Sequence, residues 1–193
     1  MARLSGVPAA RAGLLARIAY RLTRRQFGMT RVPLTIAAHH PWILRGYVAY
    51  EAMLDRARLV DRRLRLLAEL EVAALIGCRF CLDIGAALGR KTGIAEAQLR
   101  ELNGYQTSPA FSPLERLVLD YAVAVTRTPV DVSDALVQAL REHLSDAQLV
   151  ELTAGLAWQN YRSRFDHALG IGAQGFSGGA YCPLAECETV AVS

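Results

Sequence analysis

Apolar side chains recur along the chain at intervals of three and four residues, which is the period of an α-helix. The segments with this period are residues 9–27, 41–58 and 61–76, a stretch after residue 78, and segments that begin near residues 112, 133 and 145. No segment shows a convincing alternation of apolar and polar residues, the pattern of a β-strand. The sequence therefore predicts an all-α protein of about seven or eight helices, in a single compact domain over residues 1–193.

The residues at the expected helix ends agree with this reading. Ser112 to Glu115 and Ser145 to Gln148 carry the residue types of a capping box, in which two side chains bind free backbone N–H groups at a helix start. Gly77 is expected to break the helix over residues 61–76, because glycine readily adopts the left-handed backbone that ends helices. Cys78 is then expected near the start of the next helix.

The composition indicates the cellular compartment of the protein. Hydrophobic residues make up 52% of it, but no apolar run approaches the ~18 residues that span a bilayer. Arginines at positions 11, 17 and 21 interrupt any apolar core of a signal peptide. We therefore expect a cytoplasmic protein. In that compartment a Cys-x-x-Cys pair is reduced at rest and typically catalytic or metal-binding.

Charge is unevenly distributed along the chain. Residues 1–50 contain arginines at eight positions and no acidic residue, although the formal net charge of the whole chain is only +4. No aromatic platform or recognition motif accompanies these arginines, so we expect no nucleic-acid partner. The apolar side of residues 9–27 is narrow, and we expect it to pack on the protein core rather than on a membrane. The arginines then face solvent or an acidic surface of the same or a neighbouring subunit.

The chemistry-bearing residues cluster around the cysteine pair. One helical face carries a carboxylate and two sulfurs among apolar or small residues: Leu64, Leu67, Glu71, Ala74, Cys78, Cys81 and Gly85. A carboxyl in an apolar stripe costs free energy unless it is paired or protonated. Glu71 is therefore a candidate general base for a thiol, with a structural ion pair to Arg164 as the alternative.

Three interpretations of Cys78 and Cys81 are open. In the redox interpretation, the three-residue spacing at a helix start allows the two thiols to form a disulfide reversibly. In the zinc interpretation, they join Cys182 and Cys187 as four thiolate ligands. In the third, they are ordinary buried cysteines on a helix face.

A later helix places polar groups where they could join this site. Its apolar stripe turns polar at Asn160, Arg164 and His167, whose side chains reach either Glu71 or solvent. Asp83 is expected to point away from the thiols and to serve a surface or capping role. His39 and His40 precede a proline in a loop and are secondary candidates.

Residues 67–85 begin with Leu-Ala-Glu-Leu-Glu, continue through Gly-Cys-Arg-Phe-Cys and end with Leu-Asp-Ile-Gly. This segment resembles the alkylhydroperoxidase D-like family of the carboxymuconolactone decarboxylase superfamily. The resemblance covers about residues 45–170, leaving residues 1–44 as a basic extension and 171–193 as an irregular tail. It implies an all-helical homo-oligomer that reduces a hydroperoxide with its dithiol, without metal or cofactor. A dithiol or thioredoxin-like partner then re-reduces it. Cys81 would be the attacking thiol and Cys78 the more exposed resolving one.

Two positions depart from the family's pattern. The peroxidase members usually carry a histidine where this chain has Gly85, and a relay glutamate where it has Leu66. We expect Glu71 and His167 to replace them. If nothing replaces them, the fold would serve as a non-catalytic helical oligomer or redox sensor, or as a zinc-stabilised binding module.

Overall fold

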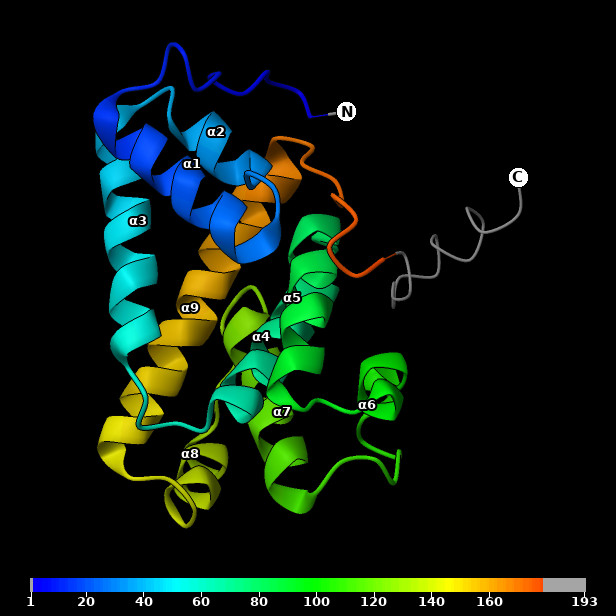
Figure 1. Cartoon of the computed structure of the whole chain (residues 1–193). Coiled ribbons are helices and arrows are strands. Elements are labelled where there is room, and N and C mark those ends of the chain that lie inside the picture. Colours follow the sequence, from blue (N-terminus) through cyan, green and yellow to red (C-terminus); the bar gives the residue numbers. More distant parts are fainter. Residues whose placement is uncertain (1, 179–193) are drawn as a thin grey trace. The chain divides into compact units, whose positions relative to one another are not determined.

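The structure is a computed structural model that describes residues 2–178, and all regular structure in this part of the chain is helical (Figure 1). Residues 2–178 form nine α-helices and one short 3₁₀-helix, which confirms the prediction of an all-α protein. The chain divides into two compact units. The first contains residues 2–57 together with 168–171, and the second contains residues 58–167 and 172–178.

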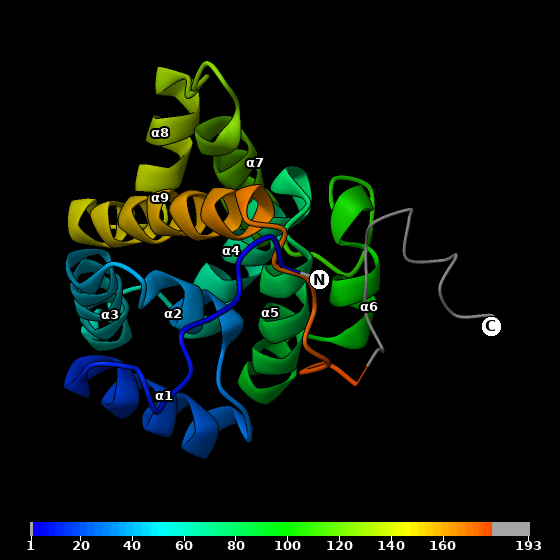
Figure 2. The ribbon, with the colours of Figure 1, turned by 90° about the horizontal axis from the view of Figure 1, so that it is seen from above.

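The first unit has three helices, which lie together in the blue and cyan part of the ribbon (Figure 2): α1 (Leu14–Phe27), α2 (Val32–Ala37) and α3 (Pro41–Arg56). The N-terminal segment is tied to the end of the last helix, because Arg3 donates from its backbone N–H to Leu169 O at 2.8 Å and from Nη1 to Ala168 O at 2.8 Å. The phenol of Tyr20 also holds this segment, through a 3.1 Å hydrogen bond to Val7 O.

The apolar row of α1 is exposed, so the prediction that it packs on the core is wrong. Leu14, Ile18 and Leu22 are 70%, 44% and 57% exposed. The helix instead packs through a neighbouring face of smaller side chains and one aromatic ring, made of Ala16, Ala19, Tyr20 and Thr23. Alanine allows close approach of helices, which hydropathy alone does not reveal.

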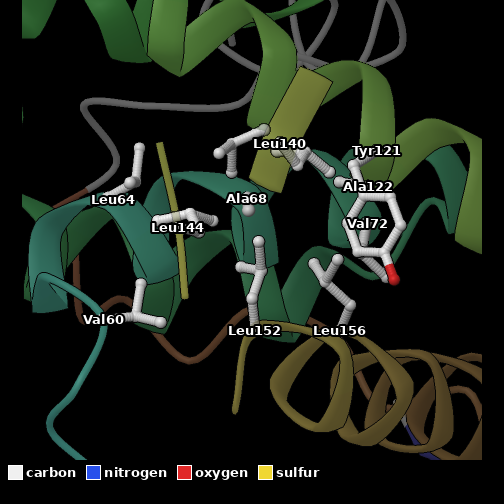
Figure 3. Close-up of a cluster of buried hydrophobic side chains, with 11 residues drawn as sticks. Val60, Leu64, Ala68, Val72, Tyr121, Ala122, Leu140, Leu144, Leu152 and Leu156 are labelled. Carbon is white, nitrogen blue, oxygen red and sulfur yellow. The ribbon is translucent and has the colours of Figure 1, made fainter. Parts of the chain in front are cut away.

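The second unit contains the remaining helices: α4 (Arg62–Ile76), α5 (Arg79–Thr92), α6 (Glu96–Arg100), η1 (Leu102–Gly104), α7 (Pro113–Thr126), α8 (Asp134–Arg141) and α9 (Asp146–Ala168). Helix α4 packs against both α5 and α7. Figure 3 shows the core beside α4, where Leu64, Ala68 and Val72 lie one turn apart and meet Leu152 and Leu156 of α9. Burial of each large apolar side chain in such a core contributes about 1.5–3 kcal/mol.

Ion pairs fix α9 beside α4. Arg65 of α4 binds Glu151 of α9 at 3.1 Å, and Arg162 of α9 binds Glu69 of α4 at 3.1 Å. Two arginines, Arg65 and Arg162, surround the half-buried carboxylate of Glu69. These pairs hold one face of α9 in a defined position relative to the helix that leads into the cysteines.

The expected helix caps are present. Ser112 and Glu115 form a reciprocal capping box at the start of α7, and Ser145 and Gln148 do the same before α9. Burial alone would raise the pKa of Glu115, but hydrogen bonds from Ser112, Gln98 and Arg63 outweigh it and hold that pKa below its usual value. Within residues 2–178, every helix is too short or too polar to cross a membrane.

Candidate functional site

The cysteine pair sits at the junction of α4 and α5. Helix α4 ends at Gly77, which has φ +76° and ψ +30°, and the N–H of Cys78 then donates back to Ala73 O at 2.9 Å. Cys78 is the N-cap of α5, and its sulfur accepts a 3.2 Å hydrogen bond from the N–H of Cys81. This confirms the expected helix break at Gly77 and the expected start of a new helix at the cysteines.

The two sulfurs are joined as a disulfide, with their Cα atoms 5.3 Å apart. The expectation that they lie within bonding reach is therefore confirmed. The expectation that Cys78 is the more exposed thiol is wrong, since Cys78 is 1% exposed and Cys81 is 7% exposed. As an N-cap, the Cys78 side chain folds back over the first turn of α5, which buries its sulfur.

Helix α9 brings two polar side chains to the sulfurs. Asp166 Oδ2 lies 3.6 Å from Cys81 Sγ and 4.0 Å from Cys78 Sγ, and Ser163 Oγ lies 3.6 Å from Cys81 Sγ. Both side chains are buried. The sequence prediction missed them, because it followed the face of α9 that ends at His167. The adjacent face also turns polar partway along, through Leu152, Leu156, Gln159, Ser163 and Asp166.

A chain of hydrogen bonds orients Ser163. Gln159 Nε2 donates to Ser163 Oγ at 2.8 Å, and Gln159 Oε1 accepts from Arg162. Arg162 is held in turn by Glu69, 3.1 Å away. The site is therefore connected to the ion pairs that join α9 to α4.

Glu71 is buried, as predicted, but it makes no hydrogen bond to either cysteine. Burial raises its pKa to about 7, and its Oε2 atom has no hydrogen-bond partner. Tyr105 is a buried tyrosine whose hydroxyl donates to Asp120 at 2.7 Å. Burial raises the pKa of Tyr105, and the Asp120 hydrogen bond and the charges of Asp120 and Glu71 raise it further. The carboxylate in contact with the sulfurs is that of Asp166.

His167 lies next to the cysteine motif, at the surface. Its Nδ1 is 3.3 Å from the carbonyl oxygen of Gly77, the residue before Cys78. Asn160 binds Thr126 Oγ1 at the end of α7. Arg164 is exposed, which agrees with the alternative that it reaches solvent, and it also donates to Thr126 O. Of the predicted polar groups on α9, only His167 therefore lies beside the cysteine loop.

Gly85 occupies the place where the peroxidase pattern has histidine, and that place is filled. A Cβ at Gly85 would lie 2.6 Å from Leu70 Cδ2. The side chain of Leu70 on α4 therefore takes the space that a larger residue on α5 would need.

Asp83 anchors the chain segment that follows α9. Its carboxylate accepts hydrogen bonds from the backbone N–H groups of residues 174–177 at 2.7–3.0 Å, and from Ser177 Oγ at 2.7 Å. Burial would raise the pKa of Asp83, but these bonds outweigh it and lower that pKa. Phe176 of the segment meets Phe80, which lies between the cysteines, edge to face at 5.9 Å. The surface or capping role expected of Asp83 is wrong, because the residue is buried and the segment that it binds is not a helix.

Three buried side chains could hold a metal ion. Cys78, Cys81 and Asp166 each offer one ligand atom, all within 4.8 Å of one another. This donor set suits zinc only when both thiols are reduced, because a disulfide offers no thiolate. Residues 171–178 are irregular, as predicted, and Cys182 and Cys187 lie outside the described residues.

Sequence comparisons connect the chain to bacterial relatives. The model of the carboxymuconolactone decarboxylase family matches residues 41–124. Uncharacterized protein YnjA of Escherichia coli K12 is 35% identical over 156 residues, which cover 80% of this chain and 85% of that protein. Uncharacterized protein YdfG of Bacillus subtilis 168 is 30% identical over 112 residues, which cover 58% of this chain and 76% of that protein.

Solved structures share the fold. A peroxidase-related protein from Ralstonia eutropha JMP134 with an alkylhydroperoxidase AhpD core matches with a TM-score of 0.82 and 20% identity, over 95% of this chain and 98% of that one. The debrominase Bmp8 matches with a TM-score of 0.79 and 15% identity, over 91% of this chain and 94% of that one. The fold is thus shared with a debrominase and with an uncharacterized peroxidase-related protein. The chain belongs to the carboxymuconolactone decarboxylase family and has the alkylhydroperoxidase D-like fold.

Proposed function

We propose that the protein is a thiol-dependent oxidoreductase that reduces hydroperoxides through a dithiol/disulfide cycle at Cys78 and Cys81. The observation that carries this proposal is the disulfide across the first turn of α5. Unpaired N–H groups and the helix dipole at such a position stabilise thiolates. The same residues can therefore exist as a reactive dithiol and as a stable disulfide.

The cycle balances with these two residues and an external dithiol. The Cys81 thiolate attacks the outer oxygen of a hydroperoxide, the O–O bond breaks, and the alcohol leaves after protonation. Cys81 is then a sulfenic acid. The Cys78 thiolate attacks its sulfur, hydroxide leaves and takes a proton from solvent, and the disulfide forms. A dithiol or thioredoxin-like reductant returns two electrons and two protons.

Cys81 is the better candidate for the attacking thiol. It is the more exposed of the two residues, and its sulfur lies 3.6 Å from the Ser163 hydroxyl. Cys78 is the buried N-cap, and the N–H bound to its sulfur favours the thiolate that closes the disulfide.

We further propose that the protein acts as a homo-oligomer in the cytoplasm. The exposed apolar row of Leu14, Ile18 and Leu22 on α1 supports an interface, because monomers rarely leave such rows uncovered. Light scattering during gel filtration would give a mass above that of one 21.1 kDa chain. A single-chain mass at micromolar concentration would contradict this part of the proposal.

A steady-state assay with tert-butyl hydroperoxide and dithiothreitol tests the proposed activity. We expect turnover by the wild type and at least a ~100-fold loss in Cys81→Ser, which removes the nucleophile. The matched control replaces Cys182 and Cys187 with serine and should retain wild-type turnover. Equal, low rates in the wild type and Cys81→Ser would contradict the proposal and favour a non-catalytic role.

A further inference from the structure

Reduction of a hydroperoxide requires a group that takes the proton of the attacking thiol, and it requires a proton for the departing oxygen. The family's usual residues are absent here, since their positions hold Gly85 and Leu66. Gly85 faces Leu70, so no side chain can be added there without displacing core atoms. Glu71, although buried, makes no hydrogen bond to a sulfur. The proton must therefore go elsewhere.

Two buried groups of α9 contact Cys81 directly. Asp166 Oδ2 and Ser163 Oγ both lie 3.6 Å from its sulfur. In the disulfide this sulfur carries no proton, but after reduction the same distance allows its S–H to donate to Asp166. A carboxylate accepts protons and a hydroxyl can donate a hydrogen bond, so Asp166 can take the proton of the Cys81 thiol and Ser163 can donate a hydrogen bond to its sulfur.

The network behind Ser163 fixes the direction of its hydroxyl proton. Arg162 can only donate, so the amide oxygen of Gln159 must face it, and the amide nitrogen must face Ser163. Ser163 Oγ therefore accepts from Gln159, and its own proton is free to point at Cys81 Sγ. A hydroxyl held in this way stabilises a thiolate at Cys81.

We propose that Asp166 receives the Cys81 thiol proton and passes it to the oxygen that leaves the hydroperoxide, while Ser163 hydrogen-bonds to the Cys81 thiolate. This assignment rests on the proposed hydroperoxide reduction. The Cys81 S–H bond breaks as Asp166 becomes a neutral acid. The thiolate then takes the outer oxygen, and Asp166 returns the proton to the alkoxide to give the alcohol.

Other titratable groups near the sulfurs are less well placed for this task. His167 lies at the surface against Gly77 O. Tyr161 has a pKa raised first by burial and then by the charge of Asp166, so it stays protonated at neutral pH. Arg162 can donate hydrogen bonds but cannot accept the thiol proton. Asp166 is the carboxylate that contacts both sulfurs.

Peptide-resolved alkylation of the reduced protein tests the assignment without any peroxide. Trypsin cleaves after Arg79, so Cys78 falls in residues 66–79 and Cys81 in residues 80–90. Removing the negative charge in Asp166→Asn should lower the midpoint of the Cys81 pH–rate profile by about one pH unit or more. Iodoacetamide should then label Cys81 faster at pH 7. Hydroperoxide turnover should nevertheless fall by about 100-fold, because the proton carrier is lost.

The opposite directions of these two effects separate a proton carrier from a structural residue. Ser163→Ala should raise the Cys81 midpoint, and it tests the site independently if Asp166→Asn does not fold. The control is Asp146→Asn, an exposed aspartate on the same helix, which should change neither measurement. An unchanged Cys81 profile in Asp166→Asn would overturn the assignment, even if turnover falls. If the wild type reduces no hydroperoxide, the proposed function fails, and the alkylation profiles still show whether Asp166 and Ser163 control the thiol.

Discussion

Replacing Glu71 with glutamine should remove part of the pH dependence of the protein's stability. Burial raises the pKa of Glu71 from 4.5 to about 7. In the unfolded chain the group ionises near pH 4.5, whereas the folded protein keeps it protonated up to about pH 7. The stability it contributes is therefore complete below pH 4.5 and is lost as the pH rises to 7. At about 1.4 kcal/mol per pH unit, this loss amounts to about 3 kcal/mol.

Urea unfolding at pH 5, 6, 7 and 8, with the Cys78–Cys81 disulfide intact, measures this effect. Glu71→Gln cannot ionise, so its free energy of unfolding should fall between pH 5 and pH 8 by about 2.5 kcal/mol less than that of the wild type, since part of the loss already occurs below pH 5. Comparing slopes cancels any constant cost of burying the amide. Glu96→Gln is the control, because Glu96 is exposed and Arg90 lowers its pKa, so it does not titrate in this range. Identical slopes in the wild type and Glu71→Gln would refute the argument that burial keeps this carboxyl neutral.

Two further substitutions test the packing around the site. Asp83→Asn should release residues 174–177 and lower the free energy of unfolding by about 2–4 kcal/mol, because a charged acceptor of several hydrogen bonds is lost. Hydrogen exchange should accelerate at these four amides. Unchanged protection would contradict the anchoring role. Gly85→Ala should lower the free energy of unfolding by about 1–3 kcal/mol, because the added Cβ would clash with the side chain of Leu70. Combined with Leu70→Ala it should cost less than the sum of the two single changes, and strict additivity would show that the two positions do not clash.

Local features of the fold could be predicted from the sequence. The glycine at position 77, the caps at Ser112 and Ser145, and the helical spacing of apolar residues each depend on a few neighbouring residues. The placement of Cys78 at a helix start follows from the same local chemistry. These predictions were correct because no distant contact is needed to explain them.

The composition of the site could not be predicted in this way. Cys81 and Asp166 are 85 residues apart in the chain, and they meet only because ion pairs and apolar side chains set α9 against α4. Periodicity shows that two faces of α9 turn polar, but not which of them faces the cysteines. The same limit explains α1, where small buried residues, rather than the larger leucines, form the packed face.

A single-turnover experiment tests most directly whether Cys78 and Cys81 act together as the redox centre. Fully reduced protein is mixed with one equivalent of tert-butyl hydroperoxide and digested with trypsin without a reductant. We expect one equivalent of alcohol, with residues 66–79 and 80–90 joined in a species about 2 Da lighter than the two free peptides together. Unconsumed peroxide with both peptides still free would contradict it.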